Sequence, residues 1–225
     1  MDGTDGTAVI GLFPLDALLV PGLVFPLHIF EPRYRQMLRD VLAAPEDARE
    51  FGVVAVRPTD DSNGRPWFSV GTTARVTEVD GYPDGRSDIT TVGQRRFTVV
   101  DVEQEQPYIR ARVTWIPEED AVVEEQGEVR AAALRAAAVF ASYRRVLSSQ
   151  DTDVSDLPDD PAMLSYVLTA AIVAPAATRQ PLLQSSSTLQ RLRLACDLMT
   201  REMAAMQVLP SLPLGAQRPG LADRN

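Results

Sequence analysis

Two side chains of this 225-residue sequence are candidates for nucleophilic or acid–base chemistry: His28 and Cys196, its single histidine and single cysteine. A histidine has an unperturbed pKa near neutrality and can act as a general base. His28, however, lies between two apolar residues of a predicted strand. Cys196 falls on the apolar stripe of a predicted helix, where a free cysteine packs as a small hydrophobic side chain. We interpret both residues as structural, and nothing in their spacing indicates a Cys–His pair.

The sequence also contains incomplete versions of metal-binding and phosphate-binding motifs. Residues 151–156 begin like a calcium loop, with acids at the first and third positions. Such a loop needs glycine at position six and glutamate at position twelve, and these positions hold Asp156 and Ala162. The N-terminal glycines lack the GxGxxG spacing of a dinucleotide-binding turn, and one histidine with one cysteine cannot build a Cys/His zinc site. We predict no metal and no cofactor.

The basic residues narrow the classes of enzyme further. All 22 positively charged side chains are arginine, and the sequence contains no lysine. A phosphate-binding loop with its lysine, a Schiff base and a Ser–Lys dyad all require that residue. The sequence therefore predicts a protein that is not an enzyme.

The charge distribution indicates the kind of partner and compartment. The net charge is −9, and acidic residues outnumber arginines on both sides of residue 117. Neither half is suited to neutralising nucleic-acid phosphates or an anionic membrane, so nucleic acid is an unlikely partner and no membrane association is expected. The first nine residues carry no basic side chain, which is wrong for an export or transit signal, and prolines interrupt the following apolar stretch. We expect a cytoplasmic protein.

The elements that must position any site fall into two parts. Residues 1–9 are predicted to be flexible, and residues 10–117 to form short strands with one helix that begins at Pro32. Alternation of apolar and polar residues over 109–115 indicates a strand with one buried face, with Arg110 and Arg112 pointing outward. Tight turns are predicted at 63–64 and 83–85.

Residues 118–208 have helical periodicity, and residues 209–225 are predicted to be a proline-containing tail. Apolar residues recur every three or four positions from Val129 to Leu147 and from Leu189 to Met206, which indicates two amphipathic helices. A further helix is predicted to begin after Asp160, a favourable N-cap, and to end near Val173. Two prolines, at 175 and 181, are predicted to separate it from the last helix.

One segment carries a family resemblance. Residues 12–38, LFPLDALLVPGLVFPLHIFEPRYRQML, resemble the opening of the Lon protease N-terminal (substrate-binding) domain. The resemblance continues through FGVVAV, GTTARVTEV and GQRRF and covers roughly residues 10–208. It implies an α+β fold, with a PUA-like small β-barrel subdomain followed by a C-terminal α-helical bundle subdomain. Full Lon proteases also carry ATPase and protease modules that depend on lysine; at 225 residues and without lysine, this sequence is expected to be a stand-alone form without those modules.

The function implied by this resemblance is ATP-independent recognition of unfolded or hydrophobic polypeptide segments. The protein would be a non-catalytic module, acting as an adaptor or chaperone-like partner of a separate protease. We expect binding through apolar contact and strand pairing beside Pro26 more than through charge, and expect two of six candidate residues to be exposed. The candidates are Phe25, Ile29, Phe30, Trp67, Phe68 and Tyr82.

Two other functions remain open at this point, and the oligomeric state is not predicted. The first is an RNA-binding PUA-like protein, in which Arg95, Arg96, Arg110 and Arg112 would contact phosphates, although Gly93 more simply predicts a bend with solvated arginines beside it. The second is a regulatory subunit associated with a peptidase.

Overall fold

Strands dominate the first half of the chain and helices the second. The structure is a computed structural model that describes residues 6–58, 65–104, 107–118, 125–148 and 157–208. The turn predicted at 63–64, the acidic segment 151–156 and the tail 209–225 lie outside these ranges. The elements in chain order are β1 (Thr7–Leu15), β2 (Val24–Ile29), α1 (Pro32–Leu42), a 3-10 turn (Glu46–Ala48), β3 (Glu50–Val56), β4 (Trp67–Gly81), β5 (Ser87–Gln104), β6 (Arg110–Trp115), α2 (Gln126–Ser148), α3 (Pro161–Ala171), α4 (Ala176–Gln184) and α5 (Thr188–Val208).

The strands form one sheet in the order β2-β5-β4-β3-β1-β6. The strand β5, second in this order, also pairs with β6, the last strand. The strand β1 pairs in parallel with β3 and antiparallel with β6, whereas β2 pairs antiparallel with the first part of β5. The mixed α+β class is therefore confirmed. The PUA-like barrel stays a prediction.

Local sequence explains why these strands form where they do. The β3 residues from Phe51 to Ala55 are all buried, as a continuous apolar run predicts, while β6 alternates exposed Arg110 and Arg112 with buried Ala111 and Val113. The pairing of β4 with β5 shifts register near Gly93. A Cβ atom at Gly93 would lie 2.1 Å from a backbone carbonyl oxygen, so glycine permits the predicted bend.

The helices follow their capping signals with one exception. Pro32 begins α1, and the Asp160 carboxylate accepts a hydrogen bond from the Met163 amide, 2.7 Å away, at the start of α3. Our prediction for residues 174–186 was wrong. Instead of two prolines separating helices, Pro175 caps a fourth helix, α4, and Pro181 lies inside it.

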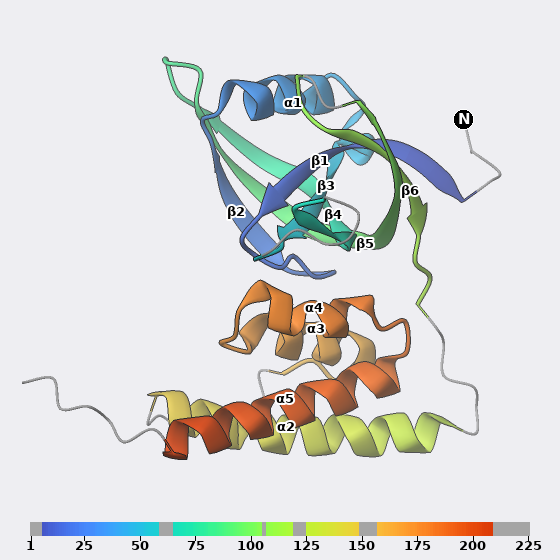
Figure 1. The fold of residues 1–225 in the computed structure, drawn as a ribbon, viewed down its shortest axis with the longest axis vertical. Coiled ribbons are helices and arrows are strands. Elements are labelled where there is room, and N and C mark those ends of the chain that lie inside the picture. The colour runs from blue at the N-terminus through green and yellow to red at the C-terminus, as the bar shows by residue number, and fades with distance from the viewer. Residues whose placement is uncertain (1–5, 59–64, 105–106, 119–124, 149–156, 209–225) are drawn as a thin grey trace, which may run out of the picture.

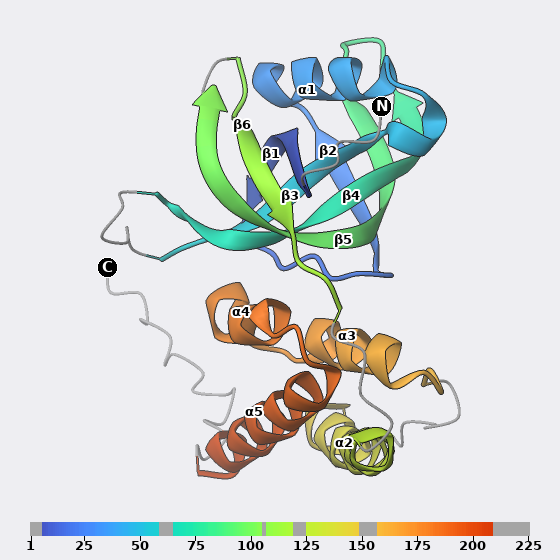
Figure 2. The same cartoon turned by 90° about the vertical axis from the view of Figure 1, so that its right-hand side faces the viewer.

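The strands and helices form separate layers (Figure 1). The helix α1 covers the top of the strand layer, while α3 and α4 lie between the strands and the lower pair α2 and α5; Figure 2 shows the same order after a quarter turn. Along α4, Gln180 donates a hydrogen bond to the Val70 carbonyl on β4 at 2.8 Å, which ties the helical layer to the sheet. None of the described helices has the length and apolar character needed to cross a bilayer.

An ionic cluster with two buried arginines joins the two layers, and we call it the Glu118 network. The side chains of Arg96 on β5 and Arg191 on α5 are 0% exposed, and each pairs with the Glu118 carboxylate, at 2.8 and 2.9 Å respectively. Both guanidiniums also donate to the Ser185 carbonyl oxygen, and the Tyr166 hydroxyl donates to Glu118. The expectation that Arg96 is solvated was therefore wrong, because its partners come from distant parts of the chain.

Candidate polypeptide-binding site

The six candidate residues divide by exposure. The side chains of Phe30 and Tyr82 are exposed, with relative accessibilities of 56% and 44%. Phe25, Trp67 and Phe68 are half-buried, and Ile29 is 1% exposed. The expectation that two of the six are exposed is confirmed.

Four candidates take part in core packing. Ile29 belongs to the core cluster beneath α1, and Phe25 packs against the same cluster, because odd-numbered residues of β2 face inward. Proposing Ile29 as a contact residue was therefore wrong. Trp67 and Phe68 lie at the start of β4, opposite to its Tyr82 end, and pack against two other core clusters. The structure does not bring these two together with Phe30 and Tyr82.

The two exposed candidates meet around His28, which the sequence predicted to have only a structural role. The ring of His28 stacks on Phe30 with centroids 5.8 Å apart and meets the edge of Tyr82 at 6.2 Å. His28 Nδ1 lies 2.5 Å from an Asp88 carboxylate oxygen, and the Tyr82 hydroxyl donates to the other oxygen of that carboxylate. We call His28, Phe30 and Tyr82 the aromatic cluster.

The electrostatics of the aromatic cluster follow from these hydrogen bonds. The bond that Tyr82 donates to Asp88 raises the pKa of the phenol, and the negative charge of Asp88 adds to this effect. The hydrogen bonds from Tyr82 and from His28 lower the pKa of the Asp88 carboxyl group. At neutral pH the cluster therefore combines exposed aromatic rings with an ionised carboxylate.

The cluster lies on a larger surface formed by the outward side chains of three adjacent strands. Cross-strand pairs place His28 opposite Asp88, Pro26 opposite Thr90, and Asp80 opposite Asp88. We call this surface the hairpin face; it consists of Val24, Pro26, His28, Phe30, Glu78, Asp80, Tyr82, Asp88 and Thr90. In Figure 1, β2 lies along the left margin of the strand layer and the tip of the β4–β5 hairpin projects at the upper left, beside α1, with the other helices below.

Alternation along β2 contains the signal that could have located this face. Val24, Pro26 and His28 are exposed and alternate with inward-facing Phe25, Leu27 and Ile29. Reading Val24–Ile29 as an alternating strand, rather than as one apolar run, would have separated Phe30 from Phe25. The pairing with Tyr82 and Asp88 depends on the register of β5 and has no equivalent local signal.

The structure does not support a reactive pair between His28 and Cys196. His28 lies on β2 in the strand layer, whereas Cys196 is buried on α5 in the lower helical layer. Burial raises the pKa of the Cys196 thiol. Within the described ranges, no three histidine, cysteine or acidic side chains are grouped closely enough to hold a metal ion.

Most of the arginines considered for RNA binding have protein partners. Arg96 is buried, so including it as a phosphate contact was wrong. Arg112 pairs with Glu103 at 2.5 Å, and the Arg95 guanidinium lies 3.9 Å from the centroid of the Trp115 ring. These contacts give no open cluster of four arginines.

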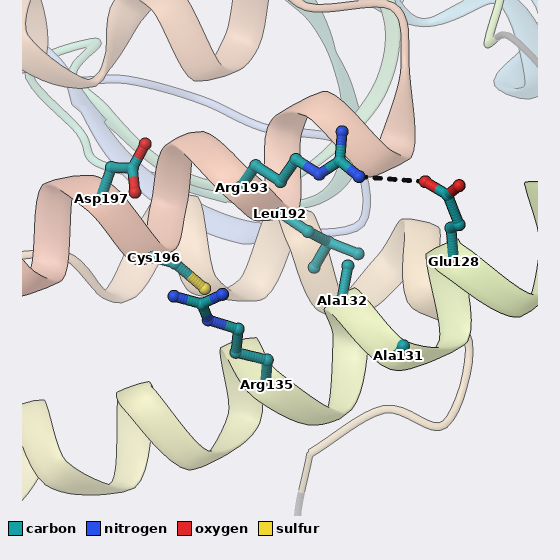
Figure 3. Close-up of a pocket in the computed structure, with 8 residues that line it drawn as sticks. All are labelled: Glu128, Ala131, Ala132, Arg135, Leu192, Arg193, Cys196 and Asp197. Carbon is teal, nitrogen blue, oxygen red and sulfur yellow. Dashed lines mark hydrogen bonds and ion pairs between the residues drawn. The ribbon is translucent and has the colours of Figure 1, made fainter.

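A hollow lies on the helical layer, between α2 and α5 (Figure 3). Its volume is about 520 Å³, and Ala131, Ala132, Leu192 and Cys196 form its apolar lining. The Glu128–Arg193 ion pair, at 3.0 Å, spans the two helices beside it, and in Figure 3 the Cys196 thiol lies near the Arg135 guanidinium. The small alanine side chains on α2 account for the hollow, and the residues around it provide no nucleophile activated by a base.

Comparison with known proteins identifies relatives for nearly the whole chain. Residues 9–201 match the family described as the ATP-dependent protease La (LON) substrate-binding domain. Lon protease of Anaeromyxobacter dehalogenans is 26% identical over 210 residues, which cover 91% of this chain and 24% of that protein. Lon protease 2 of Myxococcus xanthus is 25% identical over 206 residues, covering 89% and 24%. The chain thus spans about a quarter of the length of these curated relatives.

Solved structures share the fold. The N-terminal domain of a Mycobacterium avium complex Lon protease has a TM-score of 0.63 and 20% identity, covering 86% of this chain and 98% of that one. A Lon N-terminal domain protein from Xanthomonas campestris has a TM-score of 0.56 and 23% identity, covering 83% and 95%.

Proposed function

Because the chain belongs to the family of the ATP-dependent protease La (LON) substrate-binding domain, we propose that it recognises exposed segments of unfolded or apolar polypeptides in proteolysis. The match over residues 9–201 confirms the resemblance seen in the sequence. The proposed recognition is non-catalytic: the chain holds the segment as an adaptor, and a separate protease cleaves it.

The observation that carries this proposal is the aromatic cluster. Phe30 and Tyr82 expose large aromatic surfaces beside an edge strand, although burial of such surface is strongly favourable. Exposed aromatic side chains in a group are typical of surfaces that bind another polypeptide. The ring of His28 holds the two together, and Asp88 fixes the orientation of both His28 and Tyr82.

The proposal is tested by binding of fluorescently labelled, unfolded casein. We expect the unaltered chain to bind, and the double variant Phe30→Ser/Tyr82→Ser to bind at least about tenfold more weakly, since removal of two interface aromatics typically costs about 2 kcal/mol or more. Leu134→Ser is the matched control, because Leu134 is also exposed but lies on α2. Absence of casein binding, or equal effects of the two changes, would contradict the proposal.

The adaptor part has its own test. Casein incubated with this chain alone should stay intact, and addition of the chain to a Lon protease with ATP should change the rate of casein degradation. Cleavage by the purified chain would contradict the non-catalytic role. An unchanged rate with the protease would contradict the adaptor role.

A further inference from the structure

The edge strand β2 is a poor template for a long added strand. The Thr91 hydroxyl on β5 donates to the Phe25 carbonyl at 2.7 Å, which places the backbone groups of Phe25 on the β5 side. Backbone groups of residues two apart in a strand point the same way, so those of Val24, Pro26 and His28 face outward. Because proline has no N–H, the outward edge lacks its central donor. An added strand would pair on either side of Pro26 but not across it.

The hairpin face, by contrast, has two chemically different margins. Along β2 and at the residue that follows it, the exposed side chains are Val24, Pro26, His28 and Phe30; three of them are apolar, and the His28 ring stacks on Phe30. Along β4 the exposed side chains include Glu78 and Asp80, and neither forms an ion pair within the described part of the chain. Adjacent strands lie about 4.8 Å apart, so these two margins are separated by about 10 Å across β5.

The charge between and around these margins is negative. Asp88, in the middle strand, bonds to His28 and Tyr82 rather than to an arginine. The arginine nearest to the Tyr82 ring, Arg86, is already paired with Asp84 at 2.7 Å. Among the described residues no arginine pairs with Glu78 or Asp80, so a basic side chain that approaches the β4 margin meets two carboxylates that have no ion-pair partner.

From this arrangement we infer that the hairpin face binds a basic amphipathic helix, with its apolar side on the β2 margin and its lysines or arginines toward Glu78 and Asp80. The separation of the margins matches the diameter of a helix, about 10–12 Å with side chains. A helix also satisfies its own backbone hydrogen bonds, whereas an extended segment lying on this face would lose water from backbone groups without gaining partners. This inference rests on the proposed function and revises the expectation that strand pairing dominates and charge matters little.

The test compares two labelled peptides with the same leucine and lysine content. One places leucine at helical spacing, and the other alternates leucine with lysine as in a strand. We expect the helical-period peptide to bind at least about tenfold more tightly and to gain helical circular dichroism when bound. Equal or tighter binding of the alternating peptide would overturn the inference.

Substitutions on the hairpin face test where the peptide binds and how much its binding depends on charge. Glu78→Gln/Asp80→Asn should weaken binding of the helical-period peptide about fivefold and reduce the salt dependence of that binding, because exposed ion pairs contribute modestly and are screened by salt. Glu128→Gln, an exposed carboxylate on α2, is the control and should have no effect. If the acidic variants bind like the unaltered chain, the helix does not use this face and the inference fails.

A binding measurement with unfolded casein distinguishes failure of this inference from failure of the proposed function. Casein that binds while the helical-period peptide does not would overturn the inference and leave the proposed function in place. Failure of casein itself to bind would overturn the proposed function.

Discussion

Substitution of Glu118 with glutamine removes the negative charge that lies between two buried guanidiniums. Loss of one partner from a buried ion pair typically costs about 3–5 kcal/mol, because the remaining charge is left uncompensated. Two features reduce the cost here: the Glu118 side chain is 41% exposed, and both Arg96 and Arg191 keep the Ser185 carbonyl as an acceptor. We therefore expect Glu118→Gln to lower the free energy of unfolding by about 2–3 kcal/mol.

The assay is equilibrium unfolding in urea at neutral pH, followed by circular dichroism. In a parallel thermal melt, 1 kcal/mol corresponds to about 2–4 °C for a chain of this length, so a loss of about 2–3 kcal/mol should lower the thermal midpoint by about 4–12 °C. Glu128→Gln is the matched control, since both members of the Glu128–Arg193 pair are more than 60% exposed. Such an exposed pair contributes about 0–1 kcal/mol.

The expected loss of stability depends on burial of the arginines rather than on the number of ion pairs. Equal destabilisation by Glu118→Gln and Glu128→Gln would refute it. So would a loss below about 1 kcal/mol for Glu118→Gln, which is the value of a solvent-exposed pair.

Three further outcomes are expected. The Cys196 thiol should react slowly with thiol reagents in the native protein, because it is buried and its pKa is raised; rapid modification would contradict its packing on α5. Asp88→Asn should lower the pKa of Tyr82, because the Asp88 carboxylate accepts the hydrogen bond from the phenol. The ultraviolet absorbance of the phenolate measures this pKa, and a titration that Asp88→Asn leaves unchanged would contradict the hydrogen bond. Gly93→Ala should lower the free energy of unfolding by about 2–3 kcal/mol, because the Cβ atom of the new alanine would meet a backbone carbonyl. Gly81→Ala is the control and should change that free energy by less than about 0.5 kcal/mol, because the space around Gly81 is open. Similar unfolding midpoints for the two variants would contradict the close approach at Gly93.

Patterns that act over a few residues predicted much of the fold. Alternation in β6, the N-cap at Asp160 and the four- and three-residue spacing in α2 are local, so the sequence alone identifies those elements. The helix α4 was missed because proline is usually a helix breaker. Pro181 is tolerated there, in the second turn of a short helix.

The parts that could not be predicted depend on contacts between distant residues. Arg96 is buried because carbonyl oxygens of α4 and of the residue that follows it accept its hydrogen bonds, 87 and 89 positions further along the chain. The aromatic cluster likewise requires β2 to pair with β5 in one register, which brings His28 beside Asp88. Composition identified aromatic candidates and alternation along β2 separates exposed Phe30 from buried Ile29, but only the register brings Tyr82 and Asp88 beside His28.

The split pairing of β1 has a consequence for the order of folding. Its last residues pair with β3, which is synthesised soon afterwards, but Thr7–Gly11 pair with Arg110–Thr114 of β6. At a synthesis rate of roughly 5–20 residues per second, the first part of β1 waits about 5–20 s for its partner. The strands of the hairpin face are complete before β6 emerges, so we expect this surface to form first. Joining of β1 to β6 is then the late step, and its long sequence separation makes it the slow one.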